Sequence, residues 1–324
     1  MKKTRCIIVG VGGFARHHIN AILLKMKNST KIVALIEPNQ FSREKAVELF
    51  NEHKVKCPPF YENISDFIKS QGSADAALIC SPHKYHFENA KDCMEAGMDV
   101  CIEKPMVMNT SEAKKIISLR DRLKRLVVVA FPGSLSPAIK KAKEIIGRGE
   151  IGRVSAISAY VYQKWKSGTK GTWRQNPEIS GGGFLFDTGS HMLNTVVDIL
   201  GEDIKKVSAI FDNCGAPVEI NSSITAISVS GIMISMLAAG DSVHCSSEVI
   251  ICGDKGVIMT GIWGERLLIK KDKDSDFRQV KYEKSKGVWE QFLKVREGKI
   301  NNPCPAEVGL RFARLMDMIK ESAK

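Results

Sequence analysis

The stretch Gly10-Val11-Gly12-Gly13-Phe14-Ala15 decides the fold, because it stands directly between an expected strand and an expected helix. Residues 5–9 form a short β-branched run, and a helical pattern continues from the glycines through residue 27. The stretch is therefore a G-x-G-x-x-A loop in a strand–loop–helix context, which is typical of dinucleotide-binding sites. Glycines allow the tight turn and the close approach of a pyrophosphate, whose charge meets free backbone amides and the positive end of the helix.

An acidic residue follows the next expected strand. Residues 31–36 form that strand, and Glu37 stands 37 − 15 = 22 positions after the loop ends, near the spacing of roughly 20 in dinucleotide sites. A carboxylate at this strand end accepts hydrogen bonds from ribose hydroxyls and repels a 2′-phosphate, so NAD is favoured over NADP. Arg43 stands nearby in the sequence and leaves NADP open.

Polar residues also follow two later strands of the same strand–helix alternation. Residues 76–80 form an apolar strand ending at Ser81-Pro82-His83, and the helix that follows carries His86 in its first turn. Residues 99–102 form the next strand, which runs into Glu103-Lys104-Pro105. Open parallel sheets bind ligands outside the carboxyl ends of their strands. We therefore expect cofactor contacts from Gly10, Gly12, Gly13, Phe14, Ala15, Glu37, Ser81, Pro82, His83, His86, Glu103 and Lys104.

Several of these residues have simpler explanations when each is taken alone. Lys104 would serve equally well as a surface lysine in a loop, and His83 and His86 fit cofactor packing or helix capping better than catalysis. His17 and His18, inside the first helix, are expected to be structural or exposed. A further helix over residues 110–124 is expected to be capped by Thr110 or Ser111.

Length and composition set the outer limits. At 324 residues the chain suggests two domains, at residues 1–132 and 133–324, with the last helix free to pack back on the first domain. The composition is that of a soluble globular protein, and the apolar runs are too short for a membrane span or a signal peptide. We therefore expect a cytoplasmic protein. The cysteines number nine, an odd count, and form no Cys-x-x-Cys pair. Four of them stand in apolar, strand-like surroundings and are interpreted as reduced core residues: Cys6, Cys80, Cys101 and Cys252.

The formal charge of +12 predicts a field that attracts anions. Nucleic acid is one candidate partner, but the lysines and arginines are scattered over many helices without a basic strip interleaved with aromatic residues. A solvated basic surface is the favoured interpretation, and a phosphate-bearing cofactor or substrate would benefit from the same field. No nucleic-acid partner, membrane partner or metal site is expected.

The second half of the chain changes from helical to two-residue periodicity. A helix over residues 137–146 and a long strand over residues 153–165 come first, and residues 166–179, rich in Gly, Lys and Trp, look like a loop. Residues 253–256 give the clearest hairpin signal, and the pattern indicates one largely antiparallel sheet. The strands expected beyond residue 201 are 205–211, 223–230, 232–239, 248–252, 256–260 and 266–270, and two helices over residues 287–298 and 306–323 close the chain.

Residues 180–194 carry the most suggestive acid–base pair. Asp187 stands four residues before His191, a spacing that on one helix places both side chains on the same face, one turn apart. Three consecutive glycines, Gly181 to Gly183, would let the backbone pass close to something that a side chain would block. A chance pair on an exposed helix face is the alternative.

Taken together, several motifs of this chain carry a resemblance to a known family. They are Gly10 to Ala15, Glu37-Pro38-Asn39, residues 90–105 with Glu-Ala-Gly and Glu-Lys-Pro, Trp173-Arg174, and residues 181–191, 253–256 and 307–323. Over nearly the whole chain they resemble the Gfo/Idh/MocA family of nicotinamide-dependent oxidoreductases. The resemblance implies a Rossmann-like α/β domain followed by an α+β domain with a large, mostly antiparallel sheet. In this family that sheet commonly mediates oligomerisation, so a homo-oligomer, a dimer or a tetramer, is expected.

By position, Lys104 resembles the family's catalytic lysine, and Asp187 and His191 resemble its Asp/His pair. Glu37 departs from the commoner aspartate but keeps the negative charge, so the NAD preference should hold. Trp173 and Arg174 are candidates to line the substrate pocket, although Trp173 would also suit core packing. The family's substrates range over sugars, cyclitols, sugar acids and sugar nucleotides, so the resemblance does not fix the substrate.

The expected reaction is hydride transfer between a nicotinamide cofactor and a secondary alcohol or carbonyl of a sugar, cyclitol or sugar derivative. His191 would exchange the hydroxyl proton, Asp187 would hold its tautomer, and Lys104 would donate to the same oxygen. Which of Lys104 and His191 makes the transfer stays open. Two other functions also stay open: an NAD-dependent glycosidase that uses transient oxidation, and a cofactor-binding regulator without turnover.

Overall fold

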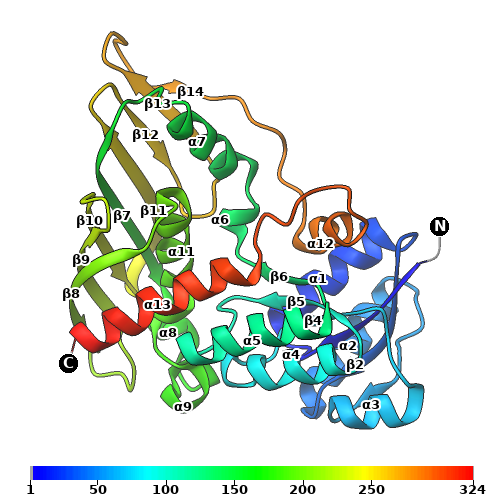
Figure 1. Ribbon diagram of the computed structural model, residues 1–324. Coiled ribbons are helices and arrows are strands. Elements are labelled where there is room, and N and C mark those ends of the chain that lie inside the picture. Colours follow the sequence, from blue (N-terminus) through cyan, green and yellow to red (C-terminus); the bar gives the residue numbers. More distant parts are fainter. Residues whose placement is uncertain (1–2, 324) are drawn as a thin grey trace. The chain divides into compact units, whose positions relative to one another are not determined.

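The computed structural model describes residues 3–323, which form two compact units. Unit 1 comprises the chain up to Ala130 together with Gly287–Ala306, and unit 2 comprises Phe131–Lys286 together with the chain from Glu307 onward. Each unit is built on one sheet, and the chain can be followed through both by colour (Figure 1).

Unit 1 contains a six-stranded sheet in which every neighbouring pair is parallel. The order β3-β2-β1-β4-β5-β6 places β1 in the interior, with the chain progressing outward on both sides of it. β4 and β6 are buried along their whole length, which explains their unbroken apolar sequences. The strands are β1 (Thr4–Val9), β2 (Thr30–Ile36), β3 (Phe60–Tyr61), β4 (Ala76–Ile79), β5 (Asp99–Glu103) and β6 (Val127–Ala130).

The helices of unit 1 connect these strands, and three of them begin with an asparagine cap. The side chains of Asn39, Asn63 and Asn109 each accept a hydrogen bond from a backbone amide in the first turn. The expected cap at Thr110 or Ser111 is therefore wrong, because Asn109 accepts from the Glu112 amide at 3.0 Å instead. The helices are α1 (Gly13–Ala21) with the π-helical turn η1 (Ile22–Met26), α2 (Gln40–Glu52), α3 (Ile64–Gln71), η2 (His83–Tyr85), α4 (His86–Glu95), α5 (Thr110–Leu123) and α12 (Val288–Arg296).

The late segment Gly287–Ala306 supplies part of the core of unit 1. Trp289 at the start of α12 is 1% exposed, and its Nε1 donates to Thr30 Oγ1 at 3.0 Å. At the other end of the segment, the Cys304 carbonyl accepts from the Val129 amide of β6 at 2.9 Å. Unit 1 is therefore completed by residues that follow β6 by more than 150 positions.

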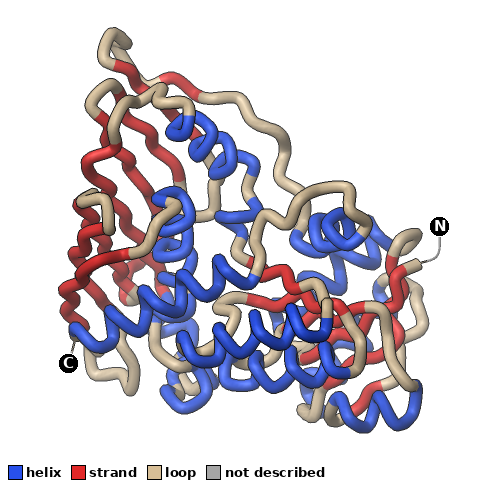
Figure 2. The backbone as a smooth tube through the Cα atoms, viewed as in Figure 1, coloured by secondary structure: helices blue, strands red, loops and turns tan. Residues whose placement is uncertain are grey.

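Unit 2 contains an eight-stranded sheet in the order β14-β13-β12-β11-β7-β10-β9-β8. The pair β7 and β10 is parallel, and the other neighbours are antiparallel, which confirms the predicted fold class. Figure 2 shows these strands in red, side by side. The strands are β7 (Val154–Lys164), β8 (Ile204–Asp212), β9 (Asn221–Ser228), β10 (Met233–Ala239), β11 (Asp241–Gly253), β12 (Gly256–Thr260), β13 (Leu267–Lys271) and β14 (Arg278–Gln279).

The helices of unit 2 include a run of short turns where a plain loop was expected. Residues 166–179 contain most of α8, all of η3 and the start of α9, so the loop prediction is wrong in detail. Helix α11 is apolar and almost wholly buried, as is typical of a helix that is covered on most of its sides. The helices are α6 (Pro132–Leu135), α7 (Pro137–Gly147), α8 (Trp165–Thr169), η3 (Trp173–Gln175), α9 (Pro177–Ser180), α10 (Phe184–Asp187), α11 (Gly189–Leu200) and α13 (Ala306–Ser322).

Two chain-wide expectations concern membranes and thiols. Over residues 3–323, no helix combines the length and the apolar character that crossing a bilayer requires. All nine cysteines are free thiols, and Cys6 and Cys101 are completely buried in their strands. Burial raises the pKa of both thiols, so they remain protonated and unreactive at neutral pH.

Candidate functional site

The loop between β1 and α1 has two kinds of glycine. Gly10 has a φ of +79°, and a Cβ there would stand 2.7 Å from the Ser81 backbone, so only glycine fits. Gly12 has ordinary backbone angles, and a Cβ there would meet no protein atom within 4 Å. The space beside Gly12 lies at the N-terminus of α1, whose first backbone amides have no partners within the helix. Gly13 and Phe14 are exposed there, whereas Ala15 is buried.

Glu37 follows β2 and is already bonded to the backbone around it. Its Oε2 accepts from the Val11 amide at 2.7 Å, and its Oε1 accepts from the Asn39 amide at 2.9 Å. Each carboxylate oxygen can accept a further hydrogen bond, so these contacts orient the Glu37 carboxylate and leave acceptor sites for a ligand. Arg43 donates its Nε to the Glu37 carbonyl, and its guanidinium lies 5.6 Å from the centre of the Phe60 ring.

The strand ends of β4 and β5 are joined through His86. Its Nε2 lies 2.8 Å from the Ser81 carbonyl oxygen, and its Nδ1 lies 2.8 Å from that of Pro105. The ring is 1% exposed, and burial lowers the pKa of His86, against the two carbonyl bonds and Glu103, which raise it. His83, buried in η2 just after Pro82, packs edge-on against His86 with 5.7 Å between ring centres.

Lys104 leaves β5 beside a buried carboxylate. The Lys104 amide donates to Glu103 Oε2 at 3.2 Å, and Glu103 Oε1 lies 2.7 Å from His18 Nε2. Sequence reasoning missed the link from α1 to β5. The signal that could have found it is a spacing: His18 stands three residues after Ala15, which places both on the same helix face. In the structure both residues are buried.

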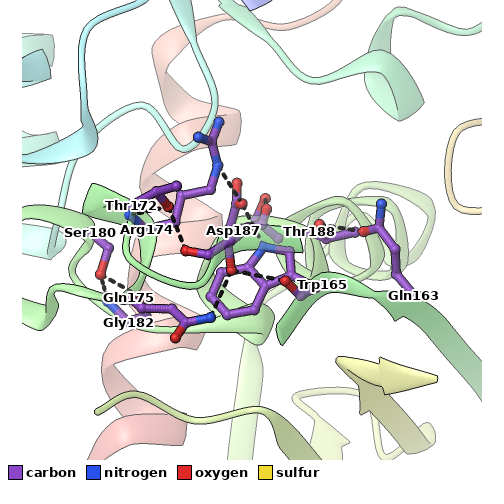
Figure 3. Close-up of polar contacts among 11 residues, drawn as sticks. Gln163, Trp165, Thr172, Arg174, Gln175, Ser180, Gly182, Asp187 and Thr188 are labelled. Carbon is purple, nitrogen blue, oxygen red and sulfur yellow. Dashed lines mark hydrogen bonds and ion pairs between the residues drawn. The ribbon is translucent and has the colours of Figure 1, made fainter. Parts of the chain in front are cut away.

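Asp187 is the centre of a polar cluster in unit 2 (Figure 3). Its Oδ2 accepts from Trp165 Nε1 at 2.9 Å and from Arg174 Nε at 3.1 Å. The Asp187 side chain is only 10% exposed, so the bond to a guanidinium offsets the cost of burying its charge. The same guanidinium lies 4.5 Å from the centre of the Trp173 ring, which ties together two residues predicted to contact substrate.

His191 lies in the first turn of α11, one helix beyond Asp187. The single helix expected for this pair is divided, because α10 ends at Asp187 and α11 begins at Gly189. The His191 ring meets Phe131 edge-on at 6.4 Å and Trp263 at 5.9 Å between ring centres. Trp263 had no signal in the sequence, since it lies in a turn between β12 and β13, far from His191 along the chain.

The glycines before α10 are required by the protein itself. A Cβ on Gly183 would stand 1.9 Å from the Glu219 carbonyl oxygen, and one on Gly182 would stand 2.7 Å from Phe186 Cβ. Phe184 also donates its amide to the Glu219 carbonyl at 2.9 Å. The close approach predicted for this stretch therefore exists, and at Gly183 its partner is the backbone of Glu219.

A pocket of about 890 Å³ opens beside Trp173 in unit 2. An indole, two amide side chains and two lysines contribute to its wall, a combination that suits polyhydroxylated or anionic ligands. One lysine, Lys166, pairs with Asp241 at 3.0 Å. The residues that give the pocket this character are Trp173, Gln175, Asn176, Lys166, Lys170 and Asp241.

The predicted residues thus divide between the two units. The strand-end set of unit 1 contains the loop glycines, Glu37, Ser81, His86 and Lys104, and the set of unit 2 contains Asp187, His191, Trp173 and Arg174. Among the residues that the structure describes, no three His, Cys, Asp or Glu side chains are grouped as a metal ion would require.

Comparison with known proteins gives matches in both units. Residues 4–131 match a model described as "Oxidoreductase family, NAD-binding Rossmann fold", and residues 139–259 match the GFO/IDH/MocA C-terminal domain. An oxidoreductase of Formosa agariphila is 25% identical over 321 residues, 96% of each chain. The D-glucoside 3-dehydrogenase of Escherichia coli is 24% identical over 63% of this chain, but the match spans only 56% of that enzyme.

A solved structure shares the whole fold. The WlbA dehydrogenase of Bordetella pertussis, crystallised with NADH and UDP-GlcNAcA, superimposes with a TM-score of 0.84. The alignment covers 100% of this chain and 96% of that one at 20% sequence identity. At this identity the likeness establishes the architecture and leaves the substrate open.

Proposed function

Because the chain belongs to the GFO/IDH/MocA oxidoreductase family with an NAD-binding Rossmann fold, we propose that it transfers a hydride between NAD and a secondary alcohol or carbonyl of a sugar, cyclitol or sugar derivative. The observation that carries the proposal is the strand-end edge of unit 1. There a glycine loop, a carboxylate and a lysine follow β1, β2 and β5 of one parallel sheet.

The residues of this edge suit a dinucleotide. The open space beside Gly12 at the N-terminus of α1 fits a pyrophosphate, and the oriented carboxylate of Glu37 fits the ribose hydroxyls. When bound, NAD supplies the acceptor for the hydride. Ser81, Pro82, His83 and Lys104 stand at the remaining strand ends, and we assign unit 1 to the cofactor and unit 2 to the substrate.

The acid–base chemistry is assigned to three side chains. His191 takes the hydroxyl proton during oxidation and returns it during reduction, since an imidazole titrates near neutral pH. Lys104 donates a hydrogen bond to the reacting oxygen and stabilises the negative charge that develops on it. Asp187, whose carboxylate is held by Arg174, is assigned the role of orienting the His191 imidazole.

The substrate class is inferred from the relatives and from the pocket beside Trp173. One named relative is a D-glucoside dehydrogenase, and the WlbA dehydrogenase was crystallised with UDP-GlcNAcA; both names refer to compounds with polyhydroxylated rings. An aromatic wall with amide and lysine side chains recognises such rings by stacking and by hydrogen bonds. Trp173 and Arg174 would contact the part of the substrate that does not react.

A homo-oligomer, a dimer or a tetramer, is proposed from the open face of the eight-stranded sheet. Met233 and Leu237 alternate with buried residues along β10 and are 68% and 41% exposed, and Ile210 on β8 is 73% exposed. On β7, Tyr160 and Tyr162 stack with 4.7 Å between ring centres. Association through this face would remove the apolar side chains from water, and sedimentation of the wild type against Leu237→Lys tests it.

The proposed roles are tested by Lys104→Met and His191→Ala, assayed with NAD across a panel of sugars and polyols. Each substitution should lower turnover by about 100-fold or more while the NAD dissociation constant stays within about threefold. Lys69→Met and His244→Ala, two exposed positions, serve as matched controls. A variant with near-normal turnover would remove that residue from the mechanism, and release of a leaving group without net NADH would favour the glycosidase alternative.

Cofactor preference is tested at Glu37. Glu37→Ala should shift the ratio of NAD to NADP affinity by about tenfold or more toward NADP, because the charge that repels a 2′-phosphate is lost. Glu37→Gln keeps an acceptor for the neighbouring amides and separates charge from loop distortion, and exposed Glu52→Ala is the control. An unchanged ratio in both Glu37 variants would refute the assignment.

A further inference from the structure

The carboxylate of Glu103 joins α1 to the residue that leaves β5. The side chain of Glu103 is 8% exposed and that of His18 is 7% exposed, with 2.7 Å between Oε1 and Nε2. The other carboxylate oxygen, Oε2, accepts from the Lys104 amide at 3.2 Å. One buried carboxylate thus bonds a side chain of the helix that begins at the glycine loop and the backbone of Lys104.

The chemistry of these atoms fixes the direction of the bond. When the Glu103 carboxylate is ionised it only accepts hydrogen bonds, and the contact then places the His18 hydrogen on Nε2. A buried carboxylate that loses a donor suffers a large desolvation penalty, and its hydrogen bonds hold it in place. Within residues 3–323, His18 is the side chain that donates to Glu103, so the orientation of this carboxylate depends on it.

The following residue is held from the opposite direction. The Pro105 carbonyl lies 2.8 Å from His86 Nδ1, while His86 Nε2 lies 2.8 Å from the Ser81 carbonyl at the end of β4. The Lys104–Pro105 pair therefore meets the Glu103 carboxylate at its amide and the His86 ring at its carbonyl. The other partner of His86 is a backbone carbonyl, that of Ser81. The other partner of Glu103 is a side chain, that of His18 in α1.

We propose that His18 is a positioning residue for Lys104, which acts by orienting Glu103 so that the Lys104 amide, and with it the lysine side chain, stays in register at the end of β5. The role of Lys104 toward the substrate rests on the proposed function, whereas the hold on its amide rests on the contacts of Glu103 alone. Phe14 of the glycine loop packs edge-on against the His18 ring at 5.1 Å, so this contact also links the cofactor loop to the lysine.

The test uses the full chain and three variants. His18→Leu removes the donor at similar volume, His18→Gln retains an amide donor, and His17→Leu changes the exposed neighbour on the same helix. Hydrogen exchange, followed by mass spectrometry on fragments containing residues 104–108, measures the hold on the Lys104 amide directly. Turnover with NAD on the sugar and polyol panel, and the NAD dissociation constant, measure the consequence.

The expected result is local and graded. In His18→Leu, exchange at residues 104–108 should rise about tenfold while α4 and β6 exchange as in the wild type. Turnover should fall by about 10- to 100-fold with NAD affinity within about threefold, as small misplacements of a catalytic group produce. His18→Gln should recover most of both effects, and His17→Leu should match the wild type.

Two results would overturn the proposal: unchanged exchange at residues 104–108 in His18→Leu, or faster exchange spread over the whole of unit 1 and not reduced in His18→Gln. Faster local exchange with unchanged turnover would support the hold on Lys104 and count instead against the role given to that lysine. If the wild type oxidises nothing in the panel, the proposed function fails, and the exchange measurement still decides the role of His18.

Discussion

The strand ends of unit 1 and the Asp187 region of unit 2 gather their polar side chains by different means. In unit 1, Gly10, Glu37 and Lys104 follow three strands of one parallel sheet, so the strand order alone brings them to one edge. In unit 2, Asp187 meets its partners through short helical turns and a tight backbone contact at Glu219. The strand ends leave open space beside Gly12, whereas the turn at Gly183 lies so close to Glu219 that it leaves no room for one methyl group.

The largest effect should come from adding that methyl group to unit 2. Gly183→Ala would place a Cβ 1.9 Å from the Glu219 carbonyl, so the backbone must move, at an expected cost of about 3 kcal/mol or more in the free energy of unfolding. Gly168→Ala, in the neighbouring α8, meets nothing within 4 Å and should change stability by less than about 1 kcal/mol. Urea denaturation of both variants measures the difference in the free energy of unfolding. Equal values would contradict the prediction, because they would show that the Glu219 backbone moves aside at little cost.

The corresponding change in unit 1 should affect binding instead of stability. Gly12→Ala adds a methyl group to open space, so unfolding should shift by no more than about 0.5 kcal/mol. NAD should nevertheless bind about 10- to 100-fold more weakly, because the methyl group would occupy the space assigned to the pyrophosphate. Calorimetric titration with NAD measures this, and Gly10→Ala, which strains the fold itself, is the contrasting variant. Unaltered NAD affinity in Gly12→Ala would remove the loop from the cofactor site.

The smallest effect should appear in the pH dependence of unit 1. Burial lowers the pKa of His86 below its ordinary value of 6.5, so the unfolded chain binds a proton at a higher pH than the folded one. The stability linked to a neutral His86 is therefore present above about pH 6.5 and is lost as the pH falls below it. His86→Gln should be less stable at pH 8 but should lose less stability between pH 7 and pH 5.5. Parallel slopes for the two proteins would contradict this assignment.

Local sequence was sufficient to predict the regular elements of both sheets. β4 is buried on both faces and has an unbroken apolar sequence, whereas β10 is buried on one face and alternates apolar and exposed positions. Each strand can therefore be predicted from its own segment of the sequence. Helix ends were less predictable. Asn109, Thr110 and Ser111 are all competent caps, and the backbone angles that select Asn109 are not written in the local sequence.

The candidate site was predictable only where regular structure supplies it. The strand ends could be located by counting strands, but the bond between His18 and Glu103 joins residues 85 positions apart. Likewise, the partners of Asp187 come from β7–α8 and η3, and the three glycines gave no indication that Glu219 would lie against them. Such contacts depend on how irregular segments pack against each other. This packing cannot be predicted from residue types and their spacing.

Unit 1 begins before unit 2 along the chain, yet it receives Trp289 and Cys304 only after residues 131–286 have been made. A nascent chain that ends near Ala130 therefore presents β6 as an open strand edge, with the Val129 amide lacking its Cys304 partner. Domains usually fold as they leave the ribosome, and open edges pair with other chains. Translation order thus leaves the Val129 amide of this edge strand without its Cys304 partner while unit 2 is being synthesised.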